Sequence, residues 1–299
     1  MNGGKTSGNR ADDLEPLLPI ERASVLFDGI FAEPKLSHPE GVAIGPDGWI
    51  WCGNQDGDLL RVSPDGRRME RVASTDGFAL GLAFDAERAC YLCDLRHAAV
   101  FRFALDTGTL SRLRADGLRI PNYPLVDRAN GRLLVSDSHA SGTPGPGIWS
   151  FPLDGGDGTL WYREPLDFAN GLAVREGEAA LYVCETFSRK ITRIPIEPDG
   201  TAGEARPFAE HLPGLPDGIA FDRTGRLVVG CYEPSRLLRV SADGRDVELL
   251  IEDPTAHVLC HPTNIAFDGD TLYTANLGRW HLTRVAMDVG AEPLWSRST

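Results

Sequence analysis

Short runs of apolar residues, separated by turns rich in Asp and Gly, recur along the chain at a nearly constant spacing. Six segments share one order: a starting residue usually followed by Gly, an apolar run, an Asp/Gly turn and a second apolar run. They start at Glu40, Leu80, Asn122, Asn170, Asp217 and Asn264, so that successive starts are 40, 42, 48, 47 and 47 residues apart. A period of this length indicates a repeat architecture in which each repeat is one structural unit.

Each repeat has enough apolar runs for about four strands. A third run follows the first two in every repeat, and its alternation of apolar and polar residues is typical of a half-buried strand. A fourth, short run follows in the first five repeats. Four strands in every 40 to 48 residues predict an all-β protein, a six-bladed β-propeller with four-stranded antiparallel blades around a central channel.

The sixth repeat has no obvious fourth run of its own. The segment ASVLFDG at residues 23–29 resembles VELLIED at residues 247–253 and precedes the first repeat. We therefore expect it to form the outer strand of the last blade and so to protect an otherwise open edge. The segment EPLW at residues 292–295 is an alternative for this role. We expect residues 1–20 to be a mobile polar tail and residues 21–299 to be a single propeller domain.

The starting residues of the six repeats are expected to form a polar ring at one mouth of the channel. The first strand of each blade lines the channel, and the starting residue is polar in every repeat except the one that begins at Leu80. Burying five such groups is costly unless they are hydrogen-bonded or bind a cation, and a hard divalent cation with oxygen ligands would satisfy them. Alternatively, Asn and Asp before Gly are turn residues that bond to their own backbone.

The second strand of each blade runs antiparallel to the first, so the residues that follow it should return to the face of the ring. These residues are the expected substrate walls: 54–56, 94–97, 137–139, 185–189, 232–233 and 276–281. The longest of these connections, residues 139–147, is rich in Gly and Pro. It is either a lid over the site or an ordinary exposed loop.

Charge and segment composition limit the possible partners. The formal charge is −13, from 30 Lys and Arg against 43 Asp and Glu, so no basic footprint for nucleic acid or an anionic membrane is expected. No apolar run reaches the roughly 20 residues of a membrane span, and the first residues lack the apolar stretch of a signal peptide. We expect a cytoplasmic protein, a monomer or small homo-oligomer, that binds a small molecule.

Two short motifs that could indicate a metal or redox site fit a structural role better. Cys90 and Cys93 have the spacing of a redox or zinc motif but no second such pair; Cys93 lies at the end of a predicted second strand, and Cys90 lies just ahead of that strand. His257 and His261 would need a helix to bring their rings together, whereas their segment is a predicted loop. We therefore expect core cysteines, and histidines that form a polar wall.

Four elements resemble the regucalcin and gluconolactonase family of the senescence-marker-protein type, in matching order across nearly the whole chain. They are HPEG at residues 38–41, NYPLVD at 122–127, NGL at 170–172 and PDGI at 216–219. The resemblance implies that Glu40, Asn170 and Asp217 bind one divalent metal ion (Ca²⁺, Mg²⁺, Mn²⁺ or Zn²⁺). It also implies that Asn122 contacts the substrate or a metal-bound water.

By the same resemblance the chain would be a metal-dependent lactonase, a hydrolase of carboxylic esters, with Asp217 as the general base. The metal would polarise the lactone carbonyl and lower the pKa of the attacking water. Tyr123 stands where family members often carry Asp, so the polarity of the substrate can differ from that of a sugar lactone. Tyr123, His139 and His261 are the further candidates for substrate contact.

Two other functions stay open at this point. The same metal site could hydrolyse a different ester, such as an aryl ester or a phosphotriester. The propeller could also bind a protein or small ligand without catalysis, because a fold does not fix a function.

Overall fold

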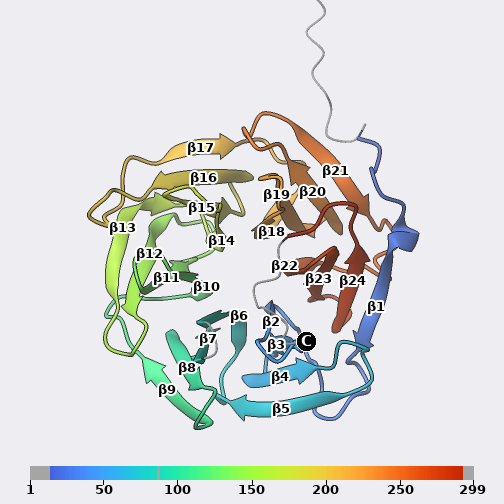
Figure 1. The fold of residues 1–299 in the computed structure, drawn as a ribbon, viewed down its shortest axis with the longest axis horizontal. Coiled ribbons are helices and arrows are strands. Elements are labelled where there is room, and N and C mark those ends of the chain that lie inside the picture. Colours follow the sequence, from blue (N-terminus) through green and yellow to red (C-terminus); the bar gives the residue numbers. More distant parts are fainter. Residues whose placement is uncertain (1–13, 86–87, 292–299) are drawn as a thin grey trace, which may run out of the picture.

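The computed structural model describes residues 14–85 and 88–291, and its 24 strands form six four-stranded antiparallel sheets. Figure 1 shows the sheets arranged as blades around a common axis, with β2, β6, β10, β14, β18 and β22 innermost. The predicted six-bladed β-propeller is therefore confirmed. Within the described residues, no helix is long and apolar enough to cross a membrane.

Consecutive strands build the first five blades from the axis outward. Blade 1 contains β2 (Val42–Ile44), β3 (Ile50–Gly53), β4 (Asp58–Val62) and β5 (Met69–Ser74). Blade 2 contains β6 (Ala79–Asp85), β7 (Ala89–Asp94), β8 (Ala99–Ala104) and β9 (Thr109–Leu113). Blade 3 contains β10 (Pro121–Asp127), β11 (Arg132–Asp137), β12 (Gly145–Pro152) and β13 (Thr159–Leu166).

The next two blades repeat this order. Blade 4 contains β14 (Ala169–Val174), β15 (Ala180–Glu185), β16 (Lys190–Pro195) and β17 (Arg206–Ala209). Blade 5 contains β18 (Leu215–Phe221), β19 (Leu227–Glu233), β20 (Arg236–Val240) and β21 (Val247–Glu252).

The sixth blade joins the two ends of the chain. It contains β22 (Pro262–Asp268), β23 (Thr271–Asn276) and β24 (His281–Ala286), and its outer strand is β1 (Ala23–Asp28). β1 pairs antiparallel with β24, beside which Figure 1 shows it. The N-terminal strand thus closes the ring as predicted, because the outer edge of β24 would otherwise be unpaired. The alternative segment, residues 292–295, lies outside the described residues.

The packed part of the chain begins earlier than the expected boundary at residue 20. The backbone N–H groups of Leu17 and Leu18 donate to the carbonyl oxygens of Leu249 and Leu250 on β21, each at 2.9 Å. Leu18 is also buried, at 6% exposure. These apolar residues add area to blade 5, so they belong with the propeller rather than with a polar tail.

The core fills the spaces between neighbouring blades. Tyr182 of blade 4 meets Phe208 of the same blade and Phe221 of blade 5 edge-on, at centroid distances of 4.9 and 4.8 Å. Second strands such as β7 and β15 are buried along their whole length because both faces of a blade are covered. All six cysteines are buried and free, and burial raises the pKa of Cys52 and Cys231 to about 12, so these thiols are core residues as predicted.

Candidate active site

The innermost strand of five blades contains a bulge at one repeated position. In β14, for example, Ala169 pairs with Glu185 and Leu172 with Val183, so Asn170 and Gly171 form the bulge. β6, β10, β18 and β22 break their register in the same way. A bulge bends its strand and redirects a side chain, and bulges are frequent beside active sites. The fold thus aims one residue of each bulge away from the regular ladder.

A glycine after the ring residue lets neighbouring blades approach closely. A Cβ atom on Gly171 would lie 2.5 Å from the carbonyl oxygen of Asp217, and one on Gly81 would lie 2.6 Å from that of Asn122. No side chain larger than hydrogen fits at such a distance. At Gly81 and Gly171 the glycine is therefore required by the packing of inner strands and not by chemistry.

The same contacts correct one member of the predicted ring. A Cβ atom on Gly171 would meet the oxygen of Asp217, the Cα of Gly218 and the nitrogen of Ile219. A Cβ atom on Gly218 would meet the corresponding atoms of Thr263, Asn264 and Ile265. In the sixth blade Thr263 therefore occupies the ring position, and Asn264 occupies the position that is Gly in four other blades.

The ring consequently consists of one residue from each blade: Glu40, Leu80, Asn122, Asn170, Asp217 and Thr263. Apart from Glu40, which is half-buried, each is at most 5% exposed. Thr263 donates its hydroxyl to the carbonyl oxygen of Glu40 at 2.8 Å, which joins blade 6 to blade 1. The structure therefore brings together the four predicted residues Glu40, Asn122, Asn170 and Asp217.

Several oxygens of this ring have no protein partner. The side-chain Oδ1 atoms of Asn122, Asn170 and Asp217 are buried and accept no hydrogen bond. Most buried polar atoms in proteins are paired, and those that are not usually indicate a bound water, an ion or a functional role. The turn-residue alternative does not explain these atoms, because a capping oxygen would accept a backbone N–H.

The two carboxyl groups of the ring influence each other. Burial raises the pKa of Asp217 well above its usual value, and the negative charge of Glu40 raises it further, whereas a hydrogen bond from Asn170 lowers it. Burial of the Glu40 carboxyl raises its pKa to about 7. A cation bound between these two acids would offset the burial and the mutual repulsion that disfavour their ionised forms.

One residue that fixes the ring was not singled out from the sequence as a positioning group. The Thr186 hydroxyl donates to the carbonyl oxygen of Pro216 at 2.8 Å and accepts from the Asn170 Nδ2 at 3.3 Å. This bond leaves Oδ1 of Asn170 free on the other side of the amide. Ser138 has the corresponding place after β11 and donates to the Ala169 carbonyl at 2.8 Å. In the sequence, these two positioning residues could have been found as a Ser or Thr directly after the second strand of a blade.

The ring residues fit a hard divalent cation. Within residues 14–85 and 88–291, no three His, Cys, Asp or Glu side chains gather into a metal-binding group. Any ion site here would instead combine the carboxylates of Glu40 and Asp217 with amide oxygen of Asn170. Ca²⁺ and Mg²⁺ prefer such oxygen ligands, and the unpartnered side-chain oxygens of the ring are free to coordinate a cation.

Most residues that open the predicted substrate walls are structural instead. Asp137 accepts from the backbone N–H groups of Arg119 and Ile120 at 3.0 and 2.9 Å, and Glu185 accepts from that of Asp167 at 2.8 Å. In the corresponding loops, Asp94 accepts from the backbone N–H of Phe78, and Asn276 accepts from that of Cys260. Because these residues are at most 2% exposed, they clamp the loop before the inner strand rather than face a substrate.

The other candidate substrate contacts lie in different surroundings. Tyr123 is half-buried at the bulge of β10, beside Asn122, and burial raises its pKa to about 12. His261 stacks on Tyr232 at a centroid distance of 4.8 Å, and its Nδ1 lies 2.9 Å from the Tyr232 carbonyl oxygen. His139 follows β11, with Nε2 at 3.1 Å from Arg119 and with Nδ1 unpartnered.

The Gly and Pro-rich loop at residues 139–147 is exposed over residues 141–144. Gly145 lies against the His139 ring, where a Cβ atom would stand 2.2 Å from Cγ. The role of this loop as a lid stays a prediction.

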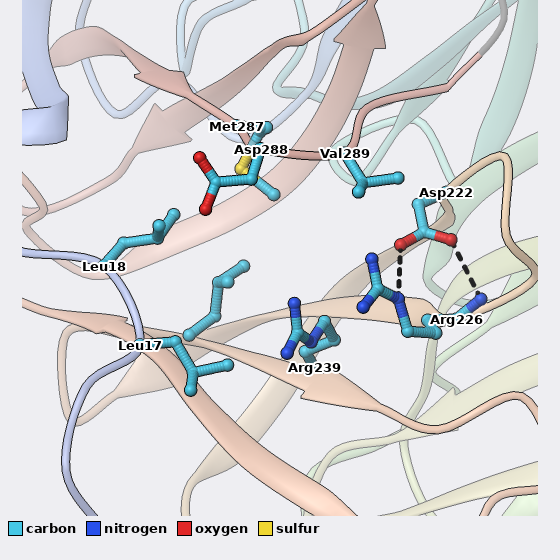
Figure 2. Close-up of a pocket in the computed structure, with 9 residues that line it drawn as sticks. Leu17, Leu18, Asp222, Arg226, Arg239, Met287, Asp288 and Val289 are labelled. Atoms are coloured by element: carbon cyan, nitrogen blue, oxygen red, sulfur yellow. Dashed lines mark hydrogen bonds and ion pairs between the residues drawn. The ribbon is translucent and has the colours of Figure 1, made fainter.

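A separate cavity of about 200 Å³ lies between blades 5 and 6 and is drawn in Figure 2. Asp222 and Arg226 line it, and they form an ion pair at 2.9 Å. Asp222 follows the last residue of β18, whereas Asp217 lies near the first, so the cavity is at the end of the strand opposite to the ring. It contains none of the predicted site residues.

Comparison with known proteins shows similarity to lactonases and to strictosidine synthase-like proteins. Residues 129–276 match the family model described as SMP-30/Gluconolactonase/LRE-like region, and residues 30–62 match the strictosidine synthase-like N-terminal model. A 6-deoxy-6-sulfogluconolactonase from Pseudomonas putida is 33% identical over 129 residues, which cover 42% of this chain and 43% of the relative. The match thus spans less than half the length of that relative.

Two longer matches extend over most of the fold. The protein strictosidine synthase-like 6 from Arabidopsis thaliana is 28% identical, covering 84% of this chain and 79% of that protein. The structure of a gluconolactonase from Xanthomonas campestris superposes with a TM-score of 0.71 at 25% identity, covering 88% of this chain and 89% of that one.

Proposed function

Because the chain belongs to the SMP-30/gluconolactonase/LRE-like family, we propose that it is a lactonase that opens a cyclic ester with the help of one divalent metal ion. The observation that carries the proposal is the set of unpartnered oxygens on Asn122, Asn170 and Asp217 beside the Glu40 carboxyl. Burying these atoms unpaired is costly, and binding a cation and a substrate would offset the cost.

Glu40, Asn170 and Asp217 would hold the ion, which would be Ca²⁺, Mg²⁺, Mn²⁺ or Zn²⁺. When bound, such an ion polarises a carbonyl oxygen and lowers the pKa of a neighbouring water molecule. The two carboxylates together carry the charge that balances a divalent ion. Thr186 keeps the Asn170 amide oriented with its oxygen free, so the ligand set is prepared before binding.

Asp217 is the proposed general base. The oxygen of the attacking water bonds to the carbonyl carbon while Asp217 accepts the proton of this water. The ring C–O bond then breaks, the departing oxygen takes up a proton, and the product leaves as a hydroxy acid. Burial and the Glu40 charge raise the pKa of Asp217 despite the hydrogen bond from Asn170, so the ionised carboxylate that this role requires would depend on the charge of the bound ion.

Three further residues are proposed to contact the substrate with Asn122. Tyr123 adjoins Asn122 at the bulge, and its raised pKa keeps the hydroxyl protonated as a hydrogen-bond donor. His261 lies two residues before the ring residue Thr263, and its stacking on Tyr232 fixes the plane of the ring. His139 has an unpartnered Nδ1 that could bind a polar group.

Hydrolysis by metal-stripped and reconstituted protein tests this function. A panel would include lactones, aryl esters and phosphotriesters, each assayed after chelation and after adding back Ca²⁺, Mg²⁺, Mn²⁺ or Zn²⁺. We expect lactone hydrolysis to disappear on stripping and to return with at least one ion. Turnover of phosphotriesters alone would identify a different hydrolase, and unchanged rates after stripping would contradict the metal-dependent mechanism.

A further inference from the structure

A second set of equivalent residues lies two positions before the ring. It consists of one residue from each blade: His38, Phe78, Ile120, Phe168, Leu215 and His261. All six are half-buried, whereas five of the six ring residues are buried. We call this set the rim. Partial exposure next to a buried polar ring is what residues at the entrance to the site would show.

Backbone hydrogen bonds fix four members of the rim against the ends of the second strands. The carbonyl oxygen of Ile120 accepts from Ser138 N–H at 2.9 Å, and that of Phe168 accepts from Thr186 N–H at 3.3 Å. The carbonyls of Phe78 and His261 accept from Leu95 and Leu277 in the same way. Because these bonds are part of the fold, the rim side chains are held in place before any ligand arrives.

The rim is divided into an apolar arc and an imidazole arc. Phe78, Ile120, Phe168 and Leu215 come from the four consecutive blades 2 to 5, whereas His261 and His38 come from the adjacent blades 6 and 1. Phe187 extends the apolar arc, since its ring lies 4.9 Å from that of Phe168 and it is 43% exposed. Trp280 and Tyr232 pack against the histidines.

Three acidic groups near the apolar arc are already used by the protein. Asp94, Asp137 and Glu185 are buried and bonded to the backbone N–H groups of the loops that carry the arc. Arg119, which precedes Ile120, directs Nη1 to His139 at 3.1 Å. The hydroxyl groups of a sugar placed against this arc would lose water without gaining equivalent partners.

We propose that the substrate is a lactone that carries an alkyl or aryl substituent, and that this substituent packs on the apolar arc of Phe78, Ile120, Phe168 and Leu215. The inference rests on the proposed lactonase function and specifies its substrate class. The ester group faces the polar ring, and the substituent extends toward blades 2 to 5. Sugar lactones are correspondingly poor substrates.

A series of γ-lactones that differ only in the length of the side chain measures this preference. We expect kcat/KM to rise about two- to fourfold for each of the first few methylene groups, as the burial of apolar area predicts. Gluconolactone should be hydrolysed with a lower kcat/KM than the best alkyl lactone. A flat series, or a preference for gluconolactone, would overturn the substrate class while leaving the lactonase function intact.

Rim variants provide the structural part of the test. Phe168→Asn should lower kcat/KM for the longest lactone at least tenfold and change that for γ-butyrolactone less than twofold. Val174→Asn is the matched control and should have no effect, because Val174 is 39% exposed at the far end of β14, the strand that begins directly after Phe168. The milder Ile120→Thr should give a smaller loss in the same direction if Phe168→Asn does not fold. Equal losses on both lactones would overturn the proposal.

A binding measurement separates this inference from catalysis. Calorimetric titration with the hydroxy acids of the same series should give affinities that increase with chain length, and Ile120→Thr should reduce the increase. Failure to hydrolyse any lactone, together with length-dependent binding, would refute the proposed function but retain the apolar arc. Binding that is independent of chain length would refute the arc.

Discussion

The inner strands of blades 4 and 5 touch where Gly171 faces Asp217: a Cβ atom at position 171 would stand 2.5 Å from the carbonyl oxygen of Asp217. Real Cβ atoms essentially never approach this closely. The neighbour is backbone rather than a flexible side chain, so it cannot yield cheaply. The position of Asp217, the proposed general base, therefore depends on the absence of a side chain at residue 171 in the adjacent blade.

Replacing Gly171 by Ala should displace Asp217. We expect Gly171→Ala to lower the free energy of unfolding by about 1–3 kcal/mol through overpacking. It should also weaken cation binding at least tenfold, because Asn170 and Asp217 would separate. Thermal unfolding and calorimetric cation titration measure the two effects.

Gly108→Ala is a suitable control for this change. A Cβ atom added to Gly108 would meet nothing within 4 Å, so any loss of stability in this variant comes from the φ of +67°. It should lose a little stability and no cation affinity. Unchanged binding in Gly171→Ala would mean that the ring tolerates a shift of the inner strands.

Thr186 should act on the metal site through Asn170. Thr186→Val keeps the shape of the side chain but removes the hydroxyl that holds the Asn170 Nδ2. Changes to such supporting groups typically lower metal affinity about 10- to 100-fold, and we expect a loss in this range. Terbium luminescence or calorimetry would measure it, with the exposed Thr201→Val as control. A loss of stability with normal affinity would assign Thr186 a structural role only.

The architecture was predictable because one physical solution is repeated six times. Each blade buries both faces of a four-stranded sheet, so apolar runs recur at one period, and the outer strand missing from the sixth repeat could be found at residues 23–29. The closure by β1 confirms this. The tail boundary was less predictable, since the backbone bonds of Leu17 and Leu18 to β21 depend on a long-range contact.

The ring in the sixth blade was placed one residue too late for a related reason. A search for polar starting residues selects Asn264, but strand pairing assigns the ring position to Thr263, whose hydroxyl binds the Glu40 carbonyl. Likewise, a carboxylate at the end of a strand has the same sequence signature whether it faces a substrate or holds a backbone N–H. The sequence alone therefore does not distinguish the clamps at Asp94, Asp137 and Glu185 from substrate contacts.

The loop that carries His261 toward the ring should be sensitive to acid. Asp253 accepts hydrogen bonds from the backbone N–H groups of Thr255, His257, Val258 and Leu259. Burial alone would raise the pKa of Asp253, but the hydrogen bonds from Thr255, Val258 and Leu259 lower it to about 2 from 3.8. The ionised form is therefore stabilised by folding, and this stabilisation is present above pH 4 and lost as the pH falls toward 2.

Asp253→Asn should remove that part of the acid dependence. The variant should be less stable than the natural protein at pH 7 and should lose less additional stability between pH 4 and pH 2. Denaturant unfolding at several pH values measures both. Asp243→Asn changes an exposed turn with fewer bonds and should have a small effect. Parallel acid curves for the natural protein and Asp253→Asn would contradict the assigned role.

The central claim is that Glu40, Asn170 and Asp217 bind one divalent cation, and calorimetric titration of the metal-free protein tests it most directly. We predict one ion per chain, with more proton release at pH 6 than at pH 8.5, because the pKa of Glu40 is raised to about 7 and the ion displaces its proton. Asp217→Asn and Glu40→Gln should bind at least tenfold more weakly, whereas Glu204→Gln, at a side chain 84% exposed, should bind normally. The claim would be contradicted if the natural protein bound no cation, or if both ring variants bound the cation as tightly as the natural protein does.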